Sequence, residues 1–319
     1  MLSLKKRYYV PPGKETLPSR LWNKAVRRQV PEFPRTVQIQ TITGCNAACI
    51  FCPYSETVDS QPKGRMSMSL FEQIVDEMAR HAVRRISPYL MNEPLLDPGL
   101  FDKLAILRDR CPKARIVLTT NGSLLTPETG RRLIQSKALH AVYISFQGIE
   151  KEGYEETMRG SLVFEKTKAR VDAFIDEWQR IAARERFKIV VTMVATNKID
   201  VRKAVSYWQA KGVQSKWTHL ENRGGNTLDA QLLCRNDMRP HTNCTRLFKQ
   251  AYIMFNGDMV LCCTDYTRQA VLGNIVGSSI ESVWNGSKAK EIRALYSGGR
   301  SDLIPLCREC EIAGSEDDI

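Results

Sequence analysis

Short stretches with the length and composition of β-strands alternate along the chain with longer stretches that carry an apolar stripe at helical spacing. In the first such pair, residues 36–42 are rich in β-branched side chains, and Leu70, Ile74 and Met78 share one face of residues 69–82. The other strands are expected at 85–90, 115–120, 141–146, 187–194 and 213–219. The other helices are expected to open near Asp97 and Thr126 and to span 161–184 and 200–211.

Two helix starts carry capping signals. Ser69 and Glu72 have the spacing of a capping box, in which two side chains satisfy free backbone N–H groups reciprocally. Asp97 stands directly before Pro98, so Asp97 is expected to be the N-cap and Pro98 to lie in the first turn.

The alternation as a whole predicts an α/β fold. Six strand–helix repeats indicate parallel strands joined by right-handed crossovers. Six is fewer than the eight strands of a closed TIM barrel, so a partial (β/α)6 TIM-like barrel fits the count better. Ligands of such sheets bind at the carboxyl ends of the strands.

The pattern changes near residues 224–225, and the remainder is predicted to form a small C-terminal α+β domain. It contains a hairpin that turns at Asn256-Gly257-Asp258, followed by two short helices. We therefore divide the chain into a basic N-terminal arm (1–35), a partial barrel (36–223) and a C-terminal domain (224–319). Because the C-terminal domain looks too small for a large core, a bound metal is a plausible support for its fold.

The composition is that of a globular protein, with 43% hydrophobic and 26% charged residues among 319. No apolar run is long enough to predict a membrane span, and the N-terminal residues lack the apolar core of a secretory signal. Ten cysteines, with CxxC spacing in two places, favour metal binding in a reducing compartment over disulfides. A cytoplasmic protein is therefore expected.

The net charge of +12 is concentrated in the arm, where nine Lys or Arg residues oppose two Glu residues. The arm could be a solvated tail, or it could bind an acidic partner. The excess positive charge could also favour an anionic small substrate. RNA recognition would need stacking aromatics beside the charges, and Tyr8, Tyr9 and Trp22 are too few and too scattered. Nucleic-acid binding is therefore not expected.

Three cysteines, Cys45, Cys49 and Cys52, lie in one loop directly after the first predicted strand. Iron–sulfur clusters are held by cysteine thiolates, and three ligands leave one iron of a cubane open to another molecule. Zinc also accepts three cysteines, but a structural zinc site needs a fourth ligand and none is near.

A second set consists of Cys244, Cys262 or Cys263, Cys307 and Cys310. Four thiolates would close a cluster and leave it for electron transfer, structure or tuning. A zinc knuckle with four cysteine ligands is the alternative, since ligand type alone does not separate the two metals.

The run CNAACIFC resembles the CxxxCxxC loop of the radical S-adenosylmethionine (SAM) superfamily, and the resemblance extends over roughly residues 36–220. It implies a 4Fe-4S cluster whose open iron binds the amino and carboxylate groups of SAM. It also implies that reduction, by a flavodoxin- or ferredoxin-type partner, cleaves SAM to a 5′-deoxyadenosyl radical that takes hydrogen from a substrate.

The same resemblance suggests SAM-contacting residues at the ends of successive strands. It places Phe51 near the adenine, Glu93 at the methionine ammonium, Asn121 in a Thr-Asn-Gly turn, Ser145 against SAM and Asn197 at the ribose. Two alternatives stay open, because Glu93 could instead cap the following helix and Asn121-Gly122 is ordinary turn chemistry.

Two stretches depart from the family's usual pattern. Met91-Asn92 stands where a glycine precedes the Glu-Pro pair, and Gln147-Gly148 replaces the more usual Asp-Gly. Arg159, in Met-Arg-Gly, occupies a familiar position of the subgroup with auxiliary clusters, although a surface role is equally open.

The second cysteine set resembles the auxiliary-cluster tail called SPASM, in its shorter twitch form, as in an aminocyclitol dehydrogenase of aminoglycoside biosynthesis. This implies one auxiliary 4Fe-4S cluster on Cys244, Cys262, Cys307 and Cys310. Cys263 is left as an alternative ligand, a buried spectator or a hydrogen-atom donor to a substrate radical.

The resulting hypotheses share SAM cleavage and differ in the substrate. The first is net oxidation of a small polar molecule such as an aminocyclitol, sugar or nucleoside. The second is epimerisation with Cys263 as hydrogen donor, and the third is modification of a peptide. Glu221 and Arg223, which precede the tail, are the candidates for binding substrate or moving a proton, or they form salt bridges in a linker.

Overall fold

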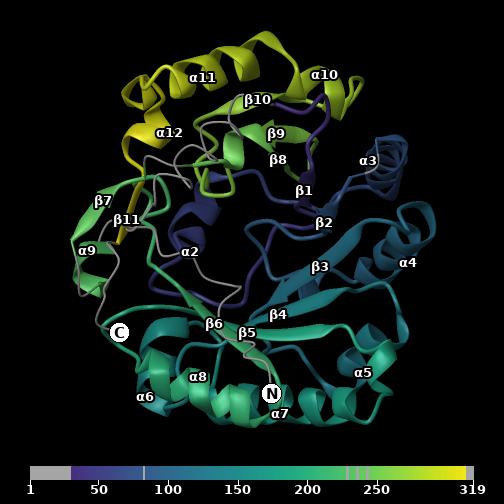
Figure 1. Ribbon diagram of the computed structural model, residues 1–319, viewed down its shortest axis with the longest axis vertical. Coiled ribbons are helices and arrows are strands. Elements are labelled where there is room, and N and C mark those ends of the chain that lie inside the picture. Colours follow the sequence, from purple (N-terminus) through teal and green to yellow (C-terminus); the bar gives the residue numbers. More distant parts are fainter. Residues whose placement is uncertain (1–29, 82, 228–229, 235–236, 242–243, 314–319) are drawn as a thin grey trace, which may run out of the picture.

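The computed structural model describes residues 30–81, 83–227, 230–234, 237–241 and 244–313; most of the predicted arm lies outside them. A curved sheet of nine strands dominates the fold, with the order β10-β9-β8-β1-β2-β3-β4-β5-β6 (Figure 1). Strands β1 to β6 pair in parallel throughout, which confirms the predicted partial barrel of the α/β class.

All six predicted barrel strands are present, and several end earlier than the sequence suggested. They are β1 (Thr36–Ile39), β2 (Arg85–Ser87), β3 (Arg115–Thr120), β4 (Ala141–Ser145), β5 (Lys188–Val194) and β6 (Gln214–Thr218).

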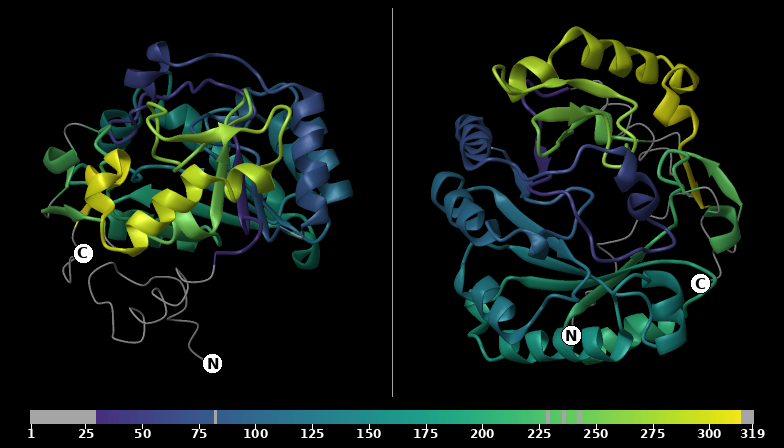
Figure 2. Two further views of the ribbon diagram at one scale, coloured as in Figure 1. Left: turned by 90° about the horizontal axis from the view of Figure 1, so that it is seen from above. Right: turned by 180° about the vertical axis from the view of Figure 1, so that it is seen from behind.

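Helices cover the outer side of these strands, as the rear view in Figure 2 shows. They are α3 (Met68–Arg80), α4 (Leu100–Arg110), α5 (Pro127–Gln135), α6 (Lys151–Met158), α7 (Phe164–Gln179) and α8 (Val201–Ala210). The short helix α2 (Tyr54–Thr57) follows the first cysteine loop. Helix α7 is shorter than the predicted helix 161–184, and the sequence analysis did not predict α6.

Two predicted helix starts were wrong, and the reason is local competition between caps. Ser67, not Ser69, caps α3 by accepting a hydrogen bond from the Leu70 N–H at 3.2 Å. The N-cap of α4 is Gly99, because the Asp97 carboxylate instead accepts from the Gly99 N–H and pairs with the buried Lys103 ammonium at 2.9 Å. A buried lysine needs such a charged partner, which takes the carboxylate away from the helix end.

The C-terminal part extends the barrel sheet. Strand β8 (Gln250–Ile253) pairs in parallel with β1, and β9 (Asp258–Val260) and β10 (Val271–Asn274) add antiparallel strands, including the predicted hairpin. The 223/224 domain boundary thus stays a prediction, since the sheet itself runs across it.

The last described residues reach the opposite edge of the barrel. Strand β11 (Glu311–Ala313) pairs with β7 (Met238–Pro240), and the Ala313 N–H donates to the Leu220 carbonyl just after β6. The remaining helices are α9 (Ala230–Leu233), α10 (Ile280–Trp284), α11 (Ser287–Ser297) and α12 (Pro305–Arg308). The C-terminal segment therefore contacts the barrel sheet beside β1 at one edge and just after β6 at the other.

One apolar core joins the barrel to the C-terminal helices. It runs from the strands to Ile280 and Trp284 of α10, and the buried Glu77 of α3 caps α10 by accepting from the Ile280 and Glu281 N–H groups. A second, smaller cluster packs around the C-terminal cysteines. None of the described helices combines the length and the apolarity that crossing a bilayer requires.

Candidate functional site

The first cysteine loop lies at the carboxyl end of β1, where the fold predicts a ligand site. Cys45, Cys49 and Cys52 are each partly buried. Burial raises the pKa of Cys45 to about 12, and nearby Glu93 and Cys52 add to the shift. Burial also raises the pKa of Cys49, with further contributions from Cys52 and Cys45. The three thiols therefore lie close enough to influence one another.

Asn46, which the sequence analysis did not single out, fixes the shape of this loop. Its side-chain oxygen accepts from Asn121 Nδ2 at 2.9 Å, and its own Nδ2 donates to Ser123 Oγ at 2.9 Å. Its backbone carbonyl accepts from the N–H and hydroxyl of Ser161. An asparagine between two candidate ligands was the only available signal, and its partners are distant in sequence.

The turn between α6 and α7 presses against the same loop. Arg159 and Gly160 both have positive φ, at 38° and 75°. A Cβ on Gly160 would lie 2.8 Å from the Asn46 carbonyl oxygen, so the close approach requires glycine here. Arg159 itself donates to the Glu156 carbonyl and is exposed.

Glu93 is buried beside this loop and is already well bonded. Its Oε1 accepts from Thr120 Oγ1 at 2.7 Å and from the Leu95 N–H at 3.1 Å, and its Oε2 accepts from the Asn121 N–H at 2.7 Å. Burial raises its pKa to about 7 against these hydrogen bonds. The carboxylate thus caps the 3-10 turn Pro94–Leu96, and a further acceptor position is left for an ammonium group.

The other predicted SAM contacts occupy varied surroundings. Asn121 is buried against the cysteine loop, and Ser145 ends β4 beside Thr192 of β5. Phe51 packs in the main core. Asn197 is held by α9, because its Nδ2 donates to the Leu232 carbonyl at 2.8 Å, which leaves its side-chain oxygen available. The structure does not test their roles, which stay predictions.

The second cysteine set gathers from three separate segments. Burial raises the pKa of Cys307, and Cys262, Cys244 and Cys310 add to the shift, so the four predicted ligands lie within electrostatic range of one another. Thr264 Oγ1 donates to Cys262 Sγ at 3.2 Å. Cys244, Cys262 and Cys307 pack in the smaller apolar cluster, which includes Leu247, Phe248 and Leu306.

Cys263 has different neighbours from Cys262. Its thiol contributes to the raised pKa of Tyr89, Tyr266 and Arg223, which lie toward the barrel interior. It packs against the apolar cluster of Leu90, Tyr252 and Met254 as well as against the smaller cluster that contains Cys262, and its thiol forms a hydrogen bond with Cys262. This placement favours Cys262 as the auxiliary ligand, which remains a prediction.

Both cysteine sets are suited to clusters by their chemistry. Within the described ranges, no three His, Cys, Asp or Glu side chains converge as the ligands of a single metal ion do. Zinc holds its sulfur ligands at about 2.3 Å from one point, whereas each cysteine of an iron–sulfur cubane binds its own iron. All-thiolate sets of three and four cysteines fit the second arrangement.

Glu221 and Arg223, the predicted catalytic pair, sit between the two sets. Arg246 binds both oxygens of Glu221, with Nη1–Oε2 at 3.0 Å, and Arg223 Nη1 lies 3.5 Å from Oε2. Burial alone would raise the Glu221 pKa, but Arg246 and Arg223 outweigh it and lower the pKa to about 2. Glu221 therefore stays ionised near neutral pH and is a poor proton shuttle.

Arg223 is the more exposed member of the pair toward the barrel mouth. Its φ of 54° is left-handed, and its buried Nε has no hydrogen-bond partner among the residues that the structure describes. The electrostatic neighbours of its guanidinium include Tyr266, Cys52 and Cys263. Arg223 thus remains available to bind an anionic or polar group between the cysteine sets.

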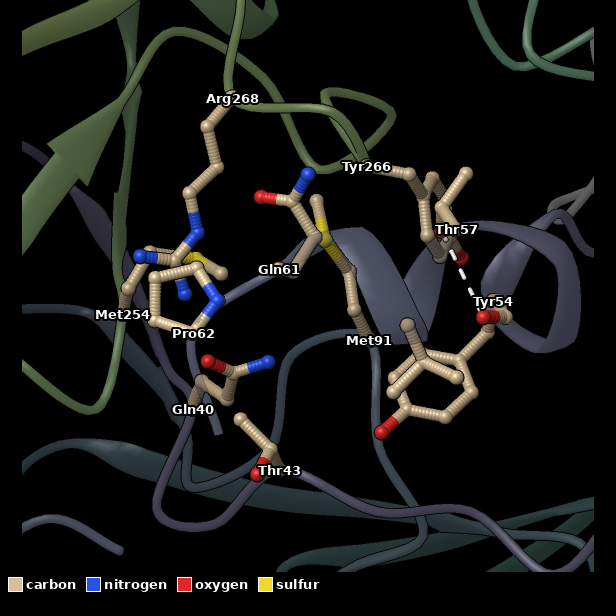
Figure 3. Close-up of a pocket in the computed structure, with 11 residues that line it drawn as sticks. Gln40, Thr43, Tyr54, Thr57, Gln61, Pro62, Met91, Met254, Tyr266 and Arg268 are labelled. Atoms are coloured by element: carbon tan, nitrogen blue, oxygen red, sulfur yellow. Dashed lines mark hydrogen bonds between the residues drawn. The ribbon is translucent and has the colours of Figure 1, made fainter. Parts of the chain in front are cut away.

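A small pocket that opens to solvent lies beside the first loop. As Figure 3 shows, Tyr266 and Arg268 come from the C-terminal part, and Tyr54 and Thr57 come from α2. The remaining lining residues are Gln40, Thr43, Val58, Gln61, Pro62, Met91 and Met254. Tyr266 also contacts the first cysteine set, since its hydroxyl lies 3.5 Å from Cys52 Sγ.

Comparison with protein families gives two matches. The model of the radical SAM superfamily matches residues 39–198. The model of the SPASM iron-sulfur cluster-binding domain matches residues 244–311. Together they cover both cysteine sets.

Individual relatives are more distant. The S-adenosyl-L-methionine-dependent 2-deoxy-scyllo-inosamine dehydrogenase of Niallia circulans is 23% identical over 275 residues, which is 86% of this chain and 91% of that protein. The structure of BtrN in complex with AdoMet and 2-DOIA aligns with a TM-score of 0.62 and 19% identity, over 86% of this chain and 92% of that one. Streptococcus suis SuiB bound to precursor peptide SuiA aligns with a TM-score of 0.65 and 16% identity, over 92% and 75%. At these identities the structures share the fold.

Proposed function

The chain belongs to the radical SAM superfamily, and on that basis we propose that it oxidises a small polar molecule such as an aminocyclitol, sugar or nucleoside. The matched families confirm the predicted cofactors, which are a SAM-binding 4Fe-4S cluster and an auxiliary cluster. The chain is thus a radical SAM enzyme with a SPASM-type tail. The substrate, the overall reaction and the residue roles are the proposed part.

We assign the SAM-binding cluster to Cys45, Cys49 and Cys52. When bound, the cluster and SAM supply a carbon-centred radical that abstracts hydrogen from the substrate. The protein's part is to hold the three thiols on one loop, which Asn46 and Gly160 do, and to present Glu93 to the amino group of SAM. Asn121, Ser145, Asn197 and Phe51 are proposed to complete this binding surface.

The lining of the barrel supports a hydroxylated substrate. Tyr143 of β4 lies under Lys216 of β6, with Nζ 4.6 Å from the ring centre, and near Arg85 of β2. Neither strand is a sheet neighbour of β4, so these contacts cross the concave face. On the same face Thr119 Oγ1 donates to the Tyr89 hydroxyl at 2.6 Å. Hydroxyl and cationic groups suit a polar substrate and disfavour an apolar one.

The arrangement of the second set supports net oxidation. Removing two hydrogens from a substrate needs an acceptor for a second electron after the radical step. The proposed ligands Cys244, Cys262, Cys307 and Cys310 gather beside Arg246, which also binds Glu221 of the barrel mouth. We propose that a cluster at this position accepts that electron, and that Arg223 holds the substrate between the two sets.

The observation that carries the proposal is that one fold brings a three-thiol loop and a four-thiol group to the same end of the barrel. The test is anaerobic reconstitution, iron counting and assay of candidate substrates with SAM and a reduced flavodoxin or ferredoxin. We expect about eight irons per chain, as two cubanes require. We also expect substrate-stimulated 5′-deoxyadenosine release and a product two mass units lighter. Absence of SAM cleavage by a fully loaded, reduced protein would contradict the proposal.

Epimerisation is a second candidate, because the thiol of Cys263, although it contacts Cys262, also lies within electrostatic range of Tyr89 and Arg223. A thiol there is placed to return a hydrogen atom to a substrate radical. A product whose mass is unchanged in H₂O but one unit higher in D₂O, and whose deuterium uptake disappears in Cys263→Ala, would favour this reaction over oxidation. A peptide product would instead favour the third hypothesis.

A further inference from the structure

The two cysteine regions meet at one side chain. Tyr266, from the loop between β9 and β10, places its hydroxyl 3.5 Å from Sγ of Cys52, although the two residues are 214 positions apart. Only three residues separate Tyr266 from Cys262, the proposed auxiliary ligand. A single short loop therefore connects the C-terminal cysteine group to the first cysteine loop.

This loop is held firmly enough to position the tyrosine. The Asp265 carboxylate accepts from the Gln269 N–H at 2.8 Å and from the Ala270 N–H at 3.0 Å. Asn226, just after the barrel, donates to the Thr264 carbonyl and accepts from the Thr267 hydroxyl. The loop is thus tied to itself and to the barrel on both sides of Tyr266.

The direction of the hydrogen bond follows from the chemistry of the partners. A cysteine that binds iron is a thiolate without a proton, so the tyrosine hydroxyl must donate. A tyrosine hydroxyl ordinarily keeps its proton at neutral pH, so it is able to donate. Hydrogen bonds to cluster sulfurs set the reduction potential, because they stabilise the more negative reduced state.

We propose that Tyr266 is a positioning residue that donates a hydrogen bond to the Cys52 thiolate and thereby raises the reduction potential of the SAM-binding cluster. The proposal rests on the assignment of Cys52 as a cluster ligand under the proposed function. It makes the ease of the first reduction depend on a loop of the C-terminal part.

The test is a redox titration of the reconstituted full chain. The reduction is monitored through the EPR signal that changes when SAM is added. In Tyr266→Phe we expect unchanged iron content and a one-electron reduction equilibrium about tenfold less favourable, as expected for one hydrogen bond to a charged group. This corresponds to a midpoint about 59 mV lower. Tyr296→Phe is the matched control, since that hydroxyl accepts from the Cys244 N–H beside the auxiliary set.

A second substitution separates tuning from a folding defect. Difluorotyrosine at position 266 keeps the shape of the side chain and is a stronger donor, so the midpoint should rise. Opposite shifts in the two variants, with no shift in Tyr296→Phe, support the proposal. Equal midpoints in wild type and the difluorotyrosine protein would overturn it. A wild-type protein that holds no SAM-responsive cluster would instead overturn the proposed function.

Discussion

Cys262 and Cys263 are adjacent in the chain but face different surroundings. Cys262 lies among Cys244, Cys307 and Cys310, whereas Cys263 lies near Tyr89 and Arg223. We expect Cys262→Ala to lose about four irons, since a cubane with a missing ligand is not retained, while Cys263→Ala keeps about eight. Iron and sulfide analysis of the two purified variants measures this directly. Equal iron loss in both, or loss only in Cys263→Ala, would reverse the ligand assignment.

At the scale of single residues, the sequence predicted which side chains have suitable chemistry better than it predicted which side chains contact one another. The cysteines were identifiable because thiolate spacing is local, and the structure leaves Glu93 and Asn121 next to them. Asn46 was missed, and Tyr266 could not be linked to Cys52, because each acts through partners that only the fold brings near. The ion pairs of Glu221 with Arg246 and Arg223 likewise depend on the tertiary structure, and they limit its use as a proton carrier.

Among the structural elements, the α6–α7 turn can be tested with a matched control, because Gly160 in that turn resembles Gly277 between β10 and α10 in its backbone conformation. Gly160 and Gly277 both have a left-handed φ, at 75° and 73°, so alanine at either position costs roughly 1–2 kcal/mol of backbone strain. Only at Gly160 would the new Cβ meet backbone, 2.8 Å from the Asn46 carbonyl oxygen, while at Gly277 nothing lies within 4 Å. The difference between the two variants isolates the contact with the cysteine loop.

We therefore expect Gly160→Ala to reduce cluster loading at the first loop, because the loop must shift away from the turn. Gly277→Ala should keep normal loading with a small loss of thermal stability. Iron content and the SAM-responsive EPR signal of the two variants provide the measurement. Normal loading in Gly160→Ala would show that the turn does not shape the cysteine loop.

The strands and helices show where pattern reasoning succeeds and where it stops. All six barrel strands were found; β1, β3, β4 and β5 are local runs of β-branched and apolar residues, whereas β6 is mostly polar. The starts of α3 at Ser67 and of α4 at Gly99 were predicted at the wrong residues, because several polar residues near each start can act as the cap. At α4, the buried Lys103 pairs with Asp97, so Asp97 does not cap the helix. The parallel pairing of β8 with β1 has no local signature, because the sequence of β8 is typical of a hairpin strand and that of β1 is typical of a barrel strand.

Across the whole molecule, positive charge collects where the barrel strands begin. The backbone segments of Arg35, Arg84 and Lys249 are hydrogen-bonded neighbours, and burial together with these two arginines lowers the pKa of Lys249. Burial and Arg115 likewise lower the pKa of His140. Among the described residues, none of these four Lys and Arg side chains has an ion-pair partner. Like charges at this end therefore oppose folding.

Salt should stabilise the protein by screening this repulsion. Raising the ionic strength from about 0.01 M to about 0.15 M shortens the Debye length from about 30 Å to about 8 Å, so the thermal midpoint should rise. Lys249→Gln should raise the midpoint at low salt and weaken the salt response, while Lys290→Gln on the exposed face of α11 should do neither. Scanning calorimetry at the two salt concentrations is the measurement. A midpoint that falls with salt would contradict this account of the charge distribution.

His140 gives the same end of the barrel a pH response. Its Nδ1 accepts from the Ile116 N–H at 3.2 Å, which only the neutral ring can do. Since its folded pKa is lowered below 6.5, the neutral form contributes stability above that pH and the contribution is lost as the pH falls. His140→Gln should therefore show a smaller stability loss than wild type between pH 7 and pH 5, measured by urea unfolding. An equal loss in both proteins would assign the effect to other groups.

The pairing of β1 with β8 also bears on how the protein is made. Gln38 and Gln250 on these strands bond to each other although they are 212 residues apart, so the ribosome exposes the cysteine loop long before its neighbouring strand exists. During that interval β1 has an open edge, and chains with such late contacts fold slowly and aggregate readily. Iron delivery to the first loop should consequently follow release of the finished polypeptide, and fragments that end before β8 should accumulate as insoluble material.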